Sequence, residues 1–167
     1  CPLDGGSVDA VFHATLRLLQ NTGHHHHTEL VAFPLANPVA VGQGAPVLDD
    51  DVRRLLQRQL ASERYDGLLV LHDDPAVNDL TFRLNAEEGS LNLATELLSH
   101  AGANGKLSPL EKGDLEPRGA NEGTATVLHA LLPARQGRAA CAKLGAEVIL
   151  DVLAELGAIE DLWRQPA

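Results

Sequence analysis

The chain has 167 residues, the length of one domain, and 44% of them are hydrophobic. Only 3% are aromatic, so the core must be built mainly from Leu, Val and Ala. The formal net charge of -10 opposes association with a phosphate backbone, and we expect no nucleic-acid partner. No apolar run approaches the roughly 20 residues that cross a bilayer, and we find no signal core, so we expect a cytoplasmic protein without a membrane partner.

The first third of the chain is predicted to begin with coil at residues 1–6 and then to form a helix. Ser7 is the expected N-cap of this helix, which covers residues 8–20. Two short apolar segments, 30–33 and 39–41, predict strands near a sheet edge because prolines interrupt this part of the chain.

Four consecutive histidines follow the first helix. Neutral imidazole is a common ligand of zinc, copper and nickel, so the run is a candidate metal site. The simpler interpretation is a solvated loop, or engineered residues related to a purification tag. The candidate ligands in the run are His24, His25, His26 and His27.

The middle of the chain predicts a helix followed by a buried strand. Three aspartates precede the helix, which is expected over residues 52–65. Residues 68–71 form a continuous apolar run, typical of a strand that is buried on both faces in a parallel sheet. We expect this strand to end where the polar residues His72, Asp73 and Asp74 begin.

The second half of the chain alternates strand-like and helix-like segments around a long loop. Residues 80–84 predict a half-buried strand, with a short helix as the alternative, and residues 90–101 predict a helix. The segment 103–123 contains several Gly and Pro residues and is long enough to be a functional loop, which we expect to act as a lid. A strand at 124–132 and a helix at 137–156 complete the pattern.

This alternation of strands and helices predicts the fold class. We expect a single α/β domain over residues 1–167, with three layers and a mostly parallel sheet flanked by helices. In such sheets ligands collect beyond the carboxyl ends of the strands. Residues that directly follow a buried strand therefore become candidate site residues.

The strongest candidate site follows the apolar run at 68–71. An imidazole and two carboxylates there could bind a divalent cation, or one carboxylate could orient the imidazole as a general base. We therefore assign His72 and Asp73 as catalytic candidates, and His72 and Asp74 as metal ligands. The competing interpretation is that the two aspartates cap the turn before Pro75 and that His72 is a hydrogen-bonded residue at the rim of the sheet.

A second histidine lies inside the strand predicted at 124–132. Alternation puts His129 on the same face as Val127 and Leu131, where a lone histidine is commonly a hydrogen-bonded core residue. If parallel neighbouring strands bring His129 beside His72, the two histidines and the nearby carboxylates form one site. His129 is therefore added to the candidate ligands of a divalent metal such as zinc or nickel.

The order of elements over residues 49–71, and later over 123–133 with the helix that follows, is similar to that of the molybdopterin-binding domains of cofactor synthesis. This resemblance implies the topology of those domains and an affinity for a pterin or a nucleotide. The glycine-rich T-G-G-T-G loop of that family should follow Leu71, where this chain has H-D-D-P, so the resemblance covers topology alone.

Three functional hypotheses stay open. The first is a metal-dependent hydrolase or lyase that acts on a small molecule through a metal-bound water, with the loop at 103–123 as its lid. The second is a binding or assembly module without catalysis, in which the helices at 8–20 and 137–156 form the interface of a homo-oligomer. The third is a degenerate relative of the molybdopterin-binding domains.

Overall fold

In the computed structural model of the chain, the described residues are 6–20, 50–62, 65–101, 105–112, 114–115 and 126–157. Their elements, in chain order, are α1 (Gly6–Gln20), α3 (Asp50–Ser62), β1 (Gly67–Asp74), β2 (Thr81–Leu84), α4 (Glu88–His100), β3 (Leu107–Pro109), β4 (Thr126–Pro133), a 3-10 turn (Ala134–Gln136) and α5 (Arg138–Glu155). The strands expected at 30–33 and 39–41 lie outside the described residues.

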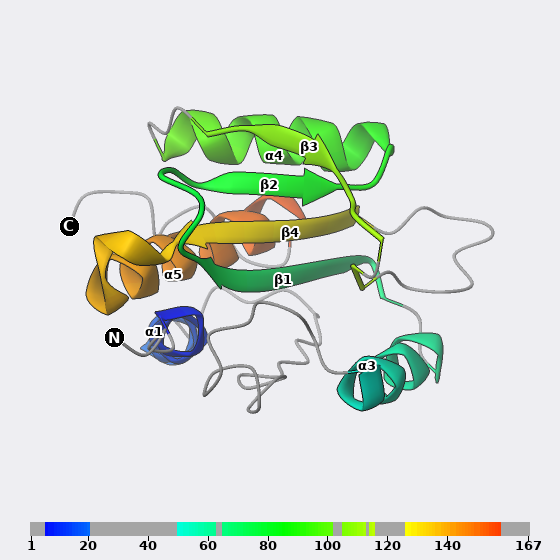
Figure 1. Cartoon of the computed structure of the whole chain (residues 1–167). Coiled ribbons are helices and arrows are strands. Elements are labelled where there is room, and N and C mark those ends of the chain that lie inside the picture. The colour runs from blue at the N-terminus through cyan, green and yellow to red at the C-terminus, as the bar shows by residue number, and fades with distance from the viewer. Residues whose placement is uncertain are drawn as a thin grey trace.

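The four strands form one mixed sheet in the order β1-β4-β2-β3. β1 pairs with β4 and β2 with β3 in parallel, whereas β2 and β4 are antiparallel. Two of the three pairings are therefore parallel, and helices surround the sheet, as Figure 1 shows, so the expected α/β class is confirmed. β4 lies between β1 and β2, and its residues after Thr126 are all buried.

One face of the sheet carries the main hydrophobic core. Alternate residues of β2 and β4 point to this face, where Phe82 and Leu132 are fully buried. α4 and α5 cover it with side chains such as Leu97 and Val148, and both helices lie behind the strands in Figure 1. Burying a side chain of this size contributes about 1.5–3 kcal/mol, so this face is a major source of hydrophobic stabilisation.

α1 packs along α5 and against β1. The two helices approach closely because small residues line their contact: a Cβ atom added to Gly145 would lie 2.6 Å from the Cβ of Ala10. Ala14 and Ala146 continue this contact as a cluster with Leu150. The two helices that the assembly hypothesis assigned to an interface between copies therefore pack against each other within one chain.

The expected elements occur with shifted ends. α1 starts at Gly6, so Ser7, the expected N-cap, lies inside the helix. β1 continues to Asp74 instead of ending after Leu71, because β4 provides a parallel partner for every residue of β1. The long loop contains the short edge strand β3, which hydrogen bonds to β2, and the helical alternative for β2 is wrong.

Candidate metal centre

His72 and His129 lie side by side on the sheet face opposite to α4 and α5. β1 and β4 are parallel neighbours, and Val70 is the register partner of His129. The two histidines share a face because side chains alternate along a strand and His72 is two positions beyond Val70. The meeting of the two histidines, which was only a condition in the sequence-based hypothesis, therefore occurs on a face of the sheet rather than beyond the carboxyl ends of its strands.

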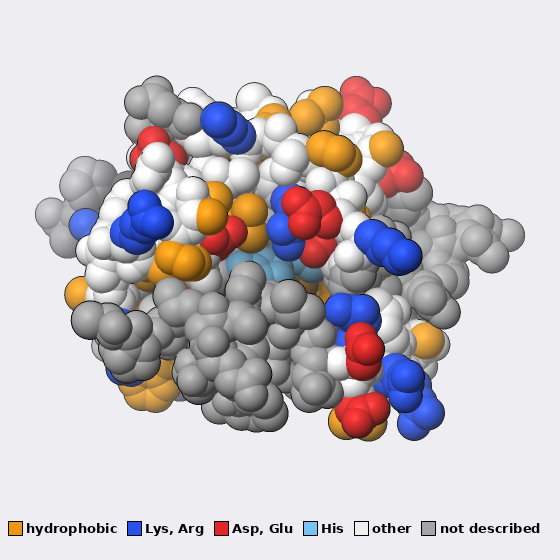
Figure 2. Space-filling view, in the orientation of Figure 1, with side chains coloured by type: hydrophobic (Ala, Val, Ile, Leu, Met, Phe, Trp, Pro, Cys, Tyr) orange, Lys and Arg blue, Asp and Glu red, His pale blue; other side chains and the backbone are white. Residues whose placement is uncertain are grey.

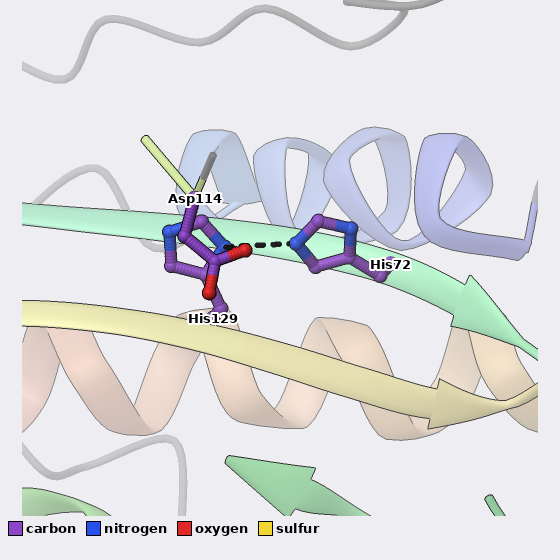
Figure 3. A group of neighbouring side chains, drawn as sticks. All are labelled: His72, Asp114 and His129. Carbon is purple, nitrogen blue, oxygen red and sulfur yellow. Dashed lines mark hydrogen bonds and ion pairs between the residues drawn. The ribbon is translucent and has the colours of Figure 1, made fainter. Parts of the chain in front are cut away.

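The two imidazole rings meet edge to edge, as Figure 3 shows. Nε2 of His72 is 2.9 Å from Nδ1 of His129, the ring centroids are 5.2 Å apart and the ring planes differ by 18°. The distance between the ring centroids exceeds the distance between the two facing nitrogens by about the width of one ring. The two nitrogens therefore lie close to the line that joins the ring centres. One hydrogen atom is therefore shared between them.

A backbone carbonyl determines the tautomer of His129. Nε2 of this ring lies 3.0 Å from the carbonyl oxygen of Leu115. A carbonyl oxygen only accepts hydrogen bonds, so Nε2 carries a hydrogen atom and, in the neutral ring, Nδ1 has the lone pair. Histidines that bind metals are commonly oriented in this way, by donating their second N–H to a carbonyl or a carboxylate.

Asp114 reaches the histidine pair from the segment that follows β3. Its Oδ1 lies 3.7 Å from Nδ1 of His129, which is longer than a hydrogen bond. The N–H of Glu111 donates to Oδ2 at 2.8 Å, and Nη2 of Arg83 donates to Oδ1 at 2.7 Å. These two donors make it possible to bury a carboxylate that is only 8% exposed.

The surroundings of His72 keep its ring uncharged at neutral pH. Burial is the main cause that lowers the pKa of His72 to about 4. Electrostatic interactions with His129 and Arg83 lower this pKa further, and the nearby carboxylate of Asp114 opposes the effect. Neutral imidazole is the form that coordinates metal ions, and coordination through Nε2 would require His72 to carry its hydrogen atom on Nδ1 instead of donating it to His129.

The three side chains together provide a set of metal ligands. One ligand atom from each of His72, Asp114 and His129 lies within 4.8 Å of the other two. With zinc–nitrogen bonds of about 2.0–2.1 Å, two nitrogens bound to one tetrahedral ion are about 3.3 Å apart. To receive an ion the facing nitrogens would separate slightly, both rings would turn toward Asp114, and the hydrogen atom shared between the nitrogens would leave. Histidine side chains are visible near the centre of the surface in Figure 2, bordered by acidic and basic groups.

The two aspartates that follow His72 make other contacts. Asp73 points to the opposite face of β1, where its carboxylate accepts hydrogen bonds from the N–H of Ser7 at 3.0 Å and from Ser7 Oγ at 2.8 Å. The carboxylate of Asp74 accepts from the N–H of Ala76 at 2.7 Å, in the turn after β1. Because the strand continues through both residues, alternation separates Asp73 from the histidines, and neither aspartate belongs to the group of three ligands.

Two further expectations lie wholly or partly outside the described residues. The histidine run at 24–27 lies outside them, so its metal binding stays a prediction. The described part of the expected lid contains β3. It also contains Asp114 and Leu115, which both lie close to His129. Closure of the lid also stays a prediction.

Sequence reasoning missed the two charged partners of the histidine pair. Asp114 lies in a loop whose length marks it as functional, yet nothing in its spacing separates it from Glu111 or Glu116. Arg83 occupies a polar position in the alternating pattern of a half-buried strand, so nothing in the sequence marks it as a site residue. The register that places it opposite His129 links two strands far apart in sequence, and this pairing brings it to the site.

Comparisons with known proteins identify no relative. No protein-family model matches the chain, and no curated protein or solved structure is significantly similar to it. Across the described ranges, no helix combines the length and the apolar character that are needed to cross a bilayer.

Proposed function

We propose that the chain binds one divalent transition-metal ion, most simply zinc, and uses it for hydrolysis or elimination on a small molecule. The ligands are Nε2 of His72, Nδ1 of His129 and a carboxylate oxygen of Asp114. The observation that carries the proposal is the convergence of these three atoms within 4.8 Å. Two imidazole nitrogens and one carboxylate oxygen are a ligand set that suits zinc.

The ligand count favours catalysis over a purely structural ion. The three protein ligands found among the described residues leave a fourth tetrahedral position for water or substrate, whereas structural zinc sites have four protein ligands. A zinc ion held this way acts as a Lewis acid and lowers the pKa of its bound water to about 7. The chain itself supplies the neutral His72, the orientation of His129 by Leu115, and a carboxylate held in place by a turn.

The other two hypotheses have less support. A non-catalytic assembly module would need a surface other than the contact between α1 and α5, and the exposed side chains of Phe12 and Leu16 on α1 are candidates for it. A relative of the molybdopterin-binding domains would need the glycine-rich loop that this chain lacks after Leu71. We also propose a small substrate rather than a nucleic acid, because the net charge of -10 repels phosphate backbones.

The test of the metal site starts from a chain in which His24 to His27 are replaced by Ser, so that the histidine run cannot chelate. Titration with Co²⁺ should show one ion per chain, with the strong visible absorption of a tetrahedral site, and Zn²⁺ should displace it. His72→Gln and Asp114→Asn should each weaken the affinity by about 100-fold or more, because each removes one of three ligands. Hydrolysis of 4-nitrophenyl acetate should require the ion and should decrease in both variants.

Two matched controls separate loss of a ligand from a general effect. Asp74→Asn changes a neighbouring carboxylate on β1, and His100→Gln removes an exposed imidazole at the end of α4. Both variants should bind Co²⁺ as the parent chain does. A parent chain that binds no ion, or equal affinities for His72→Gln and Asp74→Asn, would contradict the proposal.

A further inference from the structure

The charged group next to the proposed metal centre points to the class of substrate. Arg83 is the register partner of His129 on the neighbouring strand β2, so its side chain lies on the same face of the sheet. Its side chain is only 14% exposed, which makes it part of the site rather than of the solvated surface. A cation beside a metal ion is electrostatically unfavourable, so the presence of an arginine in this position requires an explanation.

The present partners of Arg83 leave its guanidinium incompletely bound. Nη2 donates to Oδ1 of Asp114 at 2.7 Å, and Nη1 lies 3.3 Å from Oε2 of Glu111, whose side chain is 71% exposed. The buried Nε has no hydrogen-bond partner among the described residues. A buried donor without a partner is unfavourable, so an acceptor that reaches Nε would be bound favourably.

Metal binding changes the main partner of Arg83. Oδ1 of Asp114 is the oxygen that Arg83 contacts, and it is also the oxygen that lies 3.7 Å from Nδ1 of His129. An ion that takes this oxygen as a ligand withdraws electron density from it and weakens its bond to the guanidinium. The ion and Arg83 then carry three positive charges against two negative charges on Asp114 and Glu111, which leaves an excess of one positive charge.

We propose that the substrate carries an oxyanion, a carboxylate or phosphate group, and that Arg83 binds this group beside the metal ion held by His72, His129 and Asp114. The anion balances the excess charge and accepts from the guanidinium, whose planar fork matches carboxylate and phosphate geometry. The inference rests on the proposed metal site. It adds a second binding group and a charge requirement for the substrate.

The test uses inorganic phosphate as the probe and the full chain with His24 to His27 replaced by Ser. Calorimetry should show that phosphate binds the Co²⁺-loaded chain at least about tenfold more tightly than the metal-free chain, since the ion supplies the unbalanced charge. Arg83→Met should lose about tenfold or more of this phosphate affinity and keep one Co²⁺ per chain. Arg83→Lys should fall between the two, because an ammonium group keeps the charge and loses the fork.

Glu111→Gln provides an independent test if the arginine variants do not fold. It removes an exposed carboxylate that competes for Nη1 of Arg83, so phosphate should bind the Co²⁺-loaded variant a few-fold more tightly than the parent chain. Co²⁺ binding with equal phosphate affinity in the parent, the Arg83 variants and Glu111→Gln would overturn the inference and leave the metal site standing. Absence of Co²⁺ binding in the parent would overturn both.

Discussion

The two faces of the sheet differ in the polar side chains that they bury. On the face covered by α4 and α5 the described strands present mainly apolar side chains, and the carboxylate of Asp73 is bound to the start of α1. On the other face His129, Asp114 and Arg83 are buried together with His72 beside them. Buried polar groups cost stability unless they are fully paired. The first face therefore holds the main hydrophobic core, and the second holds the candidate metal site.

The largest expected effect is on the apolar face. Leu132→Ala should lower the free energy of unfolding by about 3–4 kcal/mol, because it leaves a cavity between β4 and α5. Urea denaturation of the metal-free chain measures this change. Co²⁺ stoichiometry of the folded variant should stay at one, since Leu132 points away from the histidines. If Leu132→Ala lowered the free energy of unfolding by less than about 1 kcal/mol, the apolar face would not be the main support of the fold.

The next effect depends on pH and belongs to the histidine face. His72 has a pKa of about 4 in the folded chain, against 6.5 for an ordinary histidine. Between these values the unfolded chain takes up a proton that the folded chain does not, so stability is complete above pH 6.5 and falls as the pH decreases toward 4. The loss is at most roughly 3 kcal/mol and smaller where solvent screens the ring.

Urea denaturation of the metal-free chain at pH 7 and pH 4.5 tests this dependence. His72→Gln should lose less stability over the interval than the parent, because the glutamine side chain does not titrate. His100→Gln is the matched control and should behave as the parent does, since His100 is exposed. The same loss of stability in the parent and in His72→Gln would mean that other groups cause the pH dependence.

A smaller effect should separate Asp73 from the metal site. Asp73→Asn removes the negative charge at the N-terminus of α1 and weakens its bonds to Ser7, at a cost of about 1–2 kcal/mol. Thermal or urea unfolding measures the loss, and Co²⁺ affinity should not change. If Asp73→Asn instead weakened Co²⁺ binding as strongly as Asp114→Asn, the result would support the site role predicted for Asp73 from sequence.

The smallest effect concerns the contact between α1 and α5 at the surface. Arg138 donates to the carboxylate of Asp9, with Nη2 at 2.9 Å from Oδ1, and this bond lowers the pKa of Asp9. Asp9→Asn should cost less than about 1 kcal/mol, because exposed ion pairs are weak and screened by salt. Denaturation at low and high salt should show that most of the difference disappears in 1 M NaCl. A larger, salt-independent cost would indicate that this pair organises the packing of α1.

Local patterns predicted most of the elements and part of the site. The apolar run at 68–71 lies in β1, the described part of the strand expected at 124–132 lies in β4, and periodic apolar residues predicted α1, α3, α4 and α5. The end of β1 was mispredicted, because polar residues commonly stop a strand and only the pairing with β4 extends it to Asp74. That extension decides which side chains meet His72.

The sequence by itself determined the α/β class, the approximate position of each described α-helix and of each described strand except β3, and the choice of His72 and His129 as site candidates. It could do so because side-chain periodicity and turn residues act over a few neighbouring positions. The tertiary structure decided that the two rings face each other at 2.9 Å, that Asp114 and Arg83 join them, and that Asp73 binds α1 instead. These contacts depend on strand order and register, which link segments 14 to 66 residues apart and leave no local pattern in the chain.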